Sequence, residues 1–156
     1  MTAARTFIRS LGVIAMAAVS FACAGDGGSG SASGPSPSPG VSLTGSWVGT
    51  ASDSTGPGQM MWQVSQSGGS FNGTMTVTDT ATRQSGRGSV SGTISGSAIR
   101  FTIAIPAGGF DAPNASCTAG ATGEGQLAGT AITATYEGSS SCGGTIASGQ
   151  MTLNKQ

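Results

Sequence analysis

From residue 42 onward, apolar and polar residues alternate in short runs, and glycines separate the runs. Alternation with a period of two residues is typical of β-strands that bury one face. No stretch long enough for a helix repeats its apolar residues at helical spacing. The pattern therefore predicts an all-β domain over residues 42–156.

Three glycine-containing pairs predict tight β-hairpins, because a two-residue type II′ turn takes glycine at its first position. The predicted turns are Gly69-Ser70, Gly96-Ser97 and Gly129-Thr130. Each turn fixes which residues face each other across its hairpin. The turn at 96–97 places Ile94 opposite Ile99, and the apolar residues of that hairpin then share one face.

The other two hairpins sort their faces in the same way. The turn at 69–70 predicts that Val64 faces Met75. The turn at 129–130 predicts that Gly123 faces Tyr136, so we expect the Tyr136 ring to cover this strand glycine. The opposite faces of these hairpins carry mostly serine and threonine, which suits contact with solvent.

A first strand near 43–52 and a last strand near 145–155 complete a set of eight. All links are short enough for a meander, so we predict an eight-stranded antiparallel up-and-down barrel. A β-sandwich is the alternative, because alternation alone does not show that the sheet closes. An outer-membrane barrel fits less well, since the apolar face carries several glycines and lacks the aromatic girdles of such barrels.

The predicted links between strands differ in length at the two ends of the barrel. The three tight turns fall at one end of the barrel, and the longer links fall at the other end. The longer links are residues 53–58, 79–84, 106–116 and 139–144. This asymmetry predicts an open mouth at the long-link end and a closed floor at the tight-turn end.

The chain has three cysteines, and two of them belong to the third hairpin. The register set by the 129–130 turn places Cys117 directly opposite Cys142, at a separation that a disulfide can bridge. We therefore predict a Cys117–Cys142 disulfide, formed in an oxidising compartment. The remaining cysteine, Cys23, needs an explanation of its own.

Residues 1–22 have the organisation of a secretory signal, with Arg5 and Arg9 followed by an apolar run over 11–22. This run is shorter than the about 20 residues of a membrane-spanning helix. The small residues around Cys23 resemble a bacterial lipobox. The resemblance implies that Cys23 carries a lipid and holds the protein in the bacterial cell envelope, at the outer membrane. Ordinary signal cleavage, giving a secreted or periplasmic protein, is the alternative.

Residues 23–41 are rich in glycine, serine and proline and contain almost no large apolar residue. Such a segment cannot bury a core, so we expect a disordered, flexible tether. The predicted organisation is a signal peptide over 1–22, the tether over 23–41 and the β-barrel over 42–156.

The first predicted strand begins with Gly45-Ser46-Trp47. This triplet resembles the G-x-W motif that opens lipocalins and avidin-like proteins, together the calycin superfamily. The resemblance implies a barrel whose floor is plugged by Trp47 and covered by a basic residue from the last strand. Lys155 has the parity of the inward-facing Met151 and Leu153, so we expect it to lie over Trp47.

Composition excludes several classes of function. Charged residues make up 8% of the chain, with six basic and six acidic, and do not form the basic patch of a nucleic-acid binder. The chain has no histidine, which excludes Ser-His-Asp triads and histidine-ligated metals. Asp53, Asp79 and Asp111 lie on three mouth links without the spacing of a calcium loop. We therefore predict a protein that is not an enzyme and has no metal or cofactor.

An eight-stranded barrel is either filled by its side chains or holds one small ligand. The many inward glycines and alanines favour a cavity, and a fully packed core is the alternative. For a small hydrophobic ligand we expect Trp62, Phe101 and Tyr136 to form the walls, with the Tyr136 hydroxyl orienting the ligand. A second hypothesis is a protein-interaction module, such as an inhibitor or adhesin, that contacts its partner through Phe110 and the mouth loops.

Overall fold

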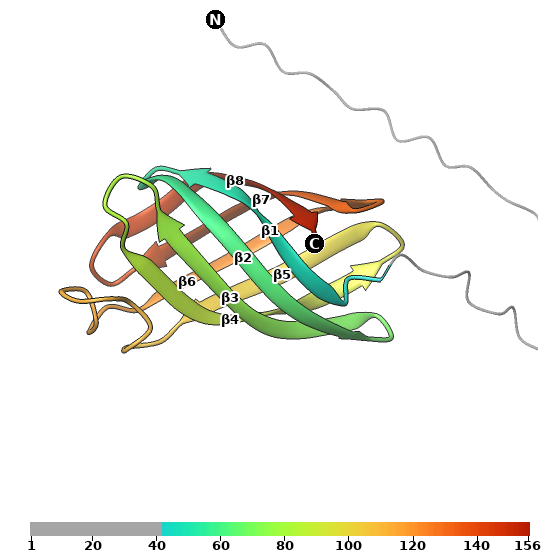
Figure 1. Ribbon diagram of the computed structural model, residues 1–156, viewed down its shortest axis with the longest axis horizontal. Coiled ribbons are helices and arrows are strands. Elements are labelled where there is room, and N and C mark those ends of the chain that lie inside the picture. The colour runs from blue at the N-terminus through green and yellow to red at the C-terminus, as the bar shows by residue number, and fades with distance from the viewer. Residues whose placement is uncertain (1–41) are drawn as a thin grey trace, which may run out of the picture. The chain divides into compact units, whose positions relative to one another are not determined.

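The computed structural model describes residues 42–156 as a closed antiparallel barrel (Figure 1). Each strand pairs with the next along the chain, and the last pairs with the first. This confirms the up-and-down barrel and excludes the sandwich. The strands are β1 (Gly45–Asp53), β2 (Gly56–Ser67), β3 (Ser70–Asp79), β4 (Ser85–Ser95), β5 (Ala98–Ile105), β6 (Ala119–Ala128), β7 (Ala131–Ser140) and β8 (Gly144–Lys155).

Alternation decides which side chains enter the barrel. In β5, Ile99, Phe101, Ile103 and Ile105 are buried and the residues between them are exposed. Within residues 42–156 the buried side chains are almost all apolar, apart from aromatic rings that carry a polar atom. The core therefore lies inside the ring of strands, and the serine and threonine faces lie outside. No helix in this part of the chain is long and apolar enough to cross a bilayer.

Two of the three predicted turns are confirmed, and the first is displaced by one residue. Gly96 and Gly129 both have φ of 61°, as the first position of a type II′ turn requires. In the first hairpin Gly68, with φ of 59°, occupies that position instead of Gly69. Val64 therefore pairs with Gly73, and the prediction that it faces Met75 was wrong. Each residue of β2 therefore pairs with a residue of β3 two positions away from the predicted one, and the same side chains still face inward.

Aromatic rings cover glycines of the neighbouring strand around the barrel. A Cβ on Gly123 would lie 2.3 Å from Cζ of Phe101, and one on Gly149 would lie 2.5 Å from Cε2 of Tyr136. Tyr136 does face Gly123 across β6 and β7, but its ring lies over Gly149 of β8. The expectation that Tyr136 covers Gly123 was therefore wrong, since the Phe101 ring fills that place. Glycine allows these close approaches because it has no side chain.

The floor end is closed by Trp47, which is fully buried. Its indole Nε1 donates a hydrogen bond of 2.7 Å to the Leu43 carbonyl. The Lys155 ammonium lies 5.5 Å from the centroid of the Trp47 ring, as the sequence pattern indicated, and donates to the Ser42 carbonyl. The described chain thus enters the barrel at its floor.

The mouth lies at the opposite end, on the left in Figure 1. Residues 106–118 form the longest link there, and residues 80–84 and 141–143 form shorter ones. The prediction that residues 53–58 form a long link was wrong, because β1 ends at Asp53 and β2 begins at Gly56, which leaves a two-residue turn at 54–55. Asp53 accepts hydrogen bonds from the backbone N–H and the hydroxyl of Thr55, which stabilises this short turn.

Candidate functional site

The mouth of the barrel contains a cavity of about 390 Å³, which we call the mouth cup. Known ligand pockets have volumes of about 300–1,000 Å³, so the mouth cup has room for one small molecule. More of its surface is apolar than polar, and four large apolar side chains contribute to it. These are Val77, Ile105, Phe110 and Ile146, beside the Cys117–Cys142 disulfide.

Below the mouth cup the barrel is filled by large side chains. Trp62 and Phe101 are buried and meet edge to face, with ring centroids 5.1 Å apart. Neither of them lines the mouth cup. Of the three residues predicted to form the ligand walls, the structure places only Tyr136 there.

Tyr136 is held at the bottom of the mouth cup by a carboxylate that the sequence pattern had not singled out for ligand binding. Its hydroxyl donates a hydrogen bond of 2.7 Å to Oδ2 of Asp53. Burial and this bond raise the pKa of Tyr136 well above its usual range, so the phenol keeps its proton at neutral pH. Asp53 has the same parity as the inward-facing Trp47 and Ala51, and this signal in the sequence was sufficient to place it inside.

An irregularity in the sheet lies beside Tyr136. The register between β7 and β8 shifts between Tyr136 and Gly138. Opposite this shift, Ser148 has a positive φ of 55°, which is uncommon for a residue other than glycine. β-bulges of this kind redirect a strand and are frequent next to functional sites. The bulge is one feature of the mouth that alternation in the sequence does not reveal.

Asp79 provides a second carboxylate at the rim. Its Oδ1 accepts hydrogen bonds from the backbone N–H groups of Ala81 and Thr82. The bond from the Thr82 N–H is the main cause of a lowered pKa, so Asp79 is ionised at neutral pH. Among the described residues that line the mouth cup, Asp53 and Asp79 are the only charged ones.

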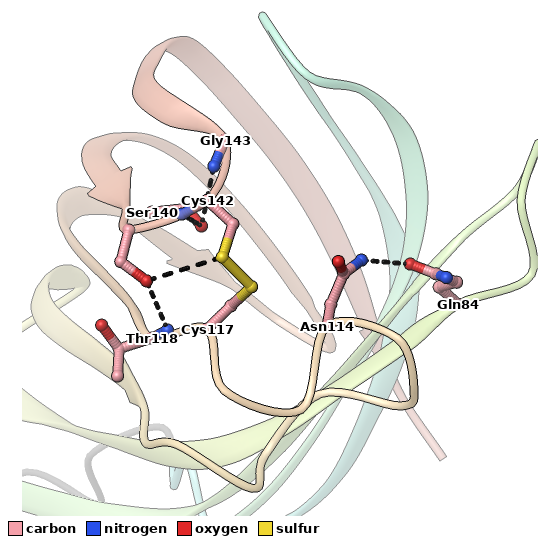
Figure 2. Close-up of a disulfide and its surroundings, with 8 residues drawn as sticks. Gln84, Asn114, Cys117, Thr118, Ser140, Cys142 and Gly143 are labelled. Carbon is pink, nitrogen blue, oxygen red and sulfur yellow. Dashed lines mark hydrogen bonds between the residues drawn. A yellow bond between two sulfur atoms is a disulfide. The ribbon is translucent and has the colours of Figure 1, made fainter.

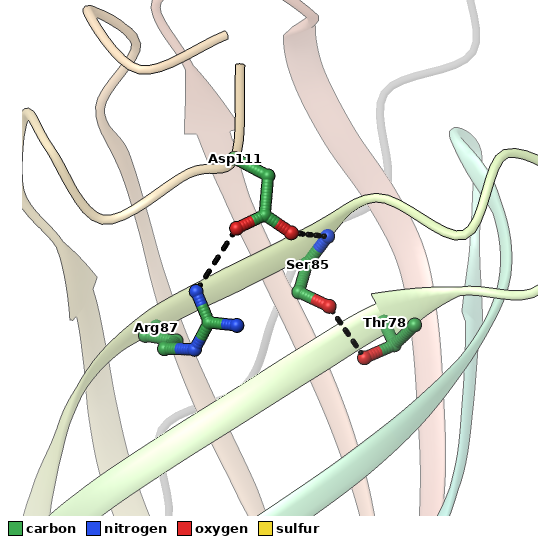
Figure 3. A network of polar contacts seen from close by, with 4 residues as sticks. All are labelled: Thr78, Ser85, Arg87 and Asp111. Carbon is green, nitrogen blue, oxygen red and sulfur yellow. Dashed lines mark hydrogen bonds and ion pairs between the residues drawn. The ribbon is translucent and has the colours of Figure 1, made fainter.

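The long link at 106–118 is fastened to β4 and forms a fixed wall (Figure 3). Asp111 accepts a hydrogen bond of 3.0 Å from the Arg87 guanidinium and one of 3.1 Å from the backbone N–H of Ser85. The bond from Arg87 is the main cause of a lowered Asp111 pKa. The Phe110 ring packs so closely on Gly86 that a Cβ there would lie 2.7 Å from it. Phe110 is thus part of the cup wall.

The three aspartates considered for calcium do not come together. Asp111 is bonded to β4 and does not line the mouth cup, whereas Asp53 and Asp79 do. Within residues 42–156 no group of three acidic, histidine or cysteine side chains is arranged to hold a metal ion.

The predicted disulfide is present (Figure 2). Both of its cysteines line the mouth cup. The disulfide joins Cys117, at the end of the long link, to Cys142 in the 141–143 turn, with Cα atoms 5.7 Å apart. A hydrogen bond of 2.6 Å from the Asn114 amide to Gln84 connects the same link to the 80–84 turn. The links around the mouth are therefore joined to one another, and the mouth cup is preformed.

The chain matches no protein-family model and no curated protein. Its function is therefore inferred from the geometry of the mouth cup.

Proposed function

We propose that this protein is a lipid-anchored, non-enzymatic protein of the bacterial envelope that binds a small, largely apolar molecule in the mouth cup. One observation carries the proposal. A barrel that is densely filled over most of its length keeps a preformed apolar cavity of about 390 Å³ at one end. A cavity of this size that combines apolar walls with polar side chains is the usual form of a small-molecule site.

The direction of the chain supports a role in capture. Ser42 and Leu43 lie at the floor, beside Lys155 and Trp47. A tether over 23–41 that begins at a lipid on Cys23 would therefore join the barrel at its floor and leave the mouth cup free of the attachment. The signal peptide, Cys23 and the tether lie outside the described residues and belong to the proposal.

The alternative, a protein-interaction module that uses the Phe110 loop, has less support. The Phe110 ring is partly buried against Gly86 in the cup wall and does not project from the loop.

The anchor is tested by expressing the full chain in a bacterial host and separating membrane from soluble fractions. We expect the wild-type chain in the membrane fraction and the Cys23→Ser variant in the soluble fraction. A wild-type chain that is soluble and carries no lipid mass would contradict the anchor.

The binding function is tested on the soluble Cys23→Ser chain by native mass spectrometry before and after denaturation, together with titration of a hydrophobic fluorescent probe. We expect bound mass or probe uptake that an Ile146→Trp variant abolishes, because the larger ring fills the mouth cup. A Thr145→Trp variant adds the same ring at an exposed neighbour and serves as the control. Absence of both bound mass and probe uptake would overturn the binding function.

A further inference from the structure

The polar groups at the bottom of the mouth cup indicate the chemistry of its ligand, an inference that rests on the proposed function. The Tyr136 hydroxyl proton is already donated to Asp53. Oδ1 of Asp53 already accepts two hydrogen bonds from Thr55, so what remains for a ligand is the acceptor capacity of the Tyr136 oxygen and of Oδ2 of Asp53. This part-buried pair can therefore accept a hydrogen bond from a ligand, but has no free proton to donate to one.

The charges around the mouth cup favour a cation. Asp53 and Asp79 line the cup, and among the described residues no arginine or lysine lines it. Arg87 is bonded to Asp111, Arg100 is on the outer face near Glu124, and Lys155 is at the floor. Arg83 is exposed in the 80–84 turn and makes no ion pair in residues 42–156. The charged side chains that line the cup in the described part of the chain are therefore both acidic, which favours a cationic ligand.

The apolar walls complete the description of the ligand. Val77, Ile105 and Ile146 offer aliphatic surface, and Phe110 offers an aromatic ring. A small ion would leave these apolar walls in contact with water. A ligand with an apolar part would displace that water, which favours binding.

We propose that the mouth cup binds a small amphiphilic amine, with the ammonium group donating to Asp53 and the Tyr136 oxygen and the apolar body against the four wall residues. Asp79 adds long-range attraction at the rim. A ligand with a carboxylate or phosphate group is repelled by both aspartates. A neutral alcohol fits the walls but brings a single donor and no charge.

The test compares three probes with the same apolar chain, namely hexylamine, hexanol and hexanoate, in calorimetric titrations of the Cys23→Ser full-length protein. We expect hexylamine to bind about tenfold or more tightly than hexanol, as a charge-assisted hydrogen bond implies, and hexanoate to bind weakest. Raising the salt concentration should weaken hexylamine binding and leave hexanol binding nearly unchanged.

Asp53→Asn is the decisive variant because it removes the charge and keeps the shape. We expect it to weaken hexylamine about tenfold and to leave hexanol almost unaffected. Glu137→Gln removes the same charge one residue from Tyr136, but on the exposed outer face, and should change neither affinity. Thermal unfolding of each variant checks that the fold is intact.

The outcomes separate this inference from the proposed function. Equal binding of hexylamine and hexanol, tighter binding of hexanoate, or an Asp53→Asn variant that loses both probes equally would overturn the amine ligand and leave a cup that binds apolar molecules. If none of the three probes and no hydrophobic dye binds, the proposed binding function is overturned as well.

Discussion

The floor and the mouth of this barrel are built from the same alternating strands, yet they differ in how completely they are filled. At the floor, Trp47, Trp62 and Leu153 are large side chains that are fully buried. At the mouth, Ala51, Ala119 and Gly86 stand at inward positions, and partly buried side chains surround a cavity. Side-chain volume at inward positions therefore separates a stabilising core from a recognition site within one regular fold.

The largest expected effect comes from truncating the floor. Trp62→Ala should lower the free energy of unfolding by about 3–5 kcal/mol, since it leaves a cavity in the filled half. Val77→Ala in the cup wall should cost only about 1 kcal/mol, because the methyl groups it removes are partly exposed. Urea unfolding measures both values. Equal costs would break the distinction between the two halves.

The disulfide tests whether the mouth also contributes to stability. Replacing both Cys117 and Cys142 with alanine should lower the free energy of unfolding by about 3–4 kcal/mol in the chain-entropy model, since the bridge closes a separation of 25 residues. The effect acts mainly on the unfolded chain, so the fluorescence of the two floor tryptophans in the folded state should not change. A shift in that fluorescence would mean that the floor depends on the mouth for its packing.

The covered glycines sharpen the comparison within a single strand. Gly123→Ala should cost about 1–3 kcal/mol, because its Cβ would lie 2.3 Å from Phe101 in the filled part of the barrel. Gly120→Ala, on the exposed outer face of the same strand, should cost less than about 0.5 kcal/mol, since its nearest contact would be at 3.8 Å. Thermal unfolding of the pair checks the difference. A reversed order would contradict the packing of Phe101 on Gly123.

The last prediction concerns the ionisation of Tyr136 at the mouth. Tyr136 is the chain's one tyrosine, so the phenolate absorbance of the protein comes from this residue alone. The pKa of Tyr136 is raised from 10.0 by burial and by Asp53. Its phenol should therefore ionise at a clearly higher pH in the folded protein than in the chain unfolded by urea. Because the folded pKa is the higher one, the contribution of Tyr136 to stability is complete below pH 10.0 and is lost as the pH rises beyond it. A phenolate signal at the same pH in both states would contradict the Tyr136–Asp53 bond.

Most of the architecture could be predicted from the sequence because alternation and turn glycines act together. The registers of the second and third hairpins follow from Gly96 and Gly129, and the disulfide follows from the latter. The turn of the first hairpin was predicted one residue too late, because Gly68 and Gly69 are both suited to the first position of a turn. Alternation cannot distinguish registers that differ by two residues, since both keep the same face inward.

The candidate site was harder to predict because it depends on height along the barrel axis. Parity shows that Trp62, Phe101 and Tyr136 point inward, but strand tilt decides that only Tyr136 reaches the mouth. Tyr136 and Asp53 are 83 residues apart in the chain and meet only after the ring has closed. No local pattern contains that contact.

Ring closure also has a kinetic consequence. Every strand pairing except that of β1 with β8 joins neighbours in the chain, so the hairpins can form early and locally, whereas the last pairing must wait for the others. β1 brings Asp53 to Tyr136 of β7 across β8, so the same late step that closes the ring also completes the mouth cup. Hydrogen exchange along the seam between β1 and β8 should then slow when the cup is occupied, since a ligand that binds only the closed ring opposes its opening.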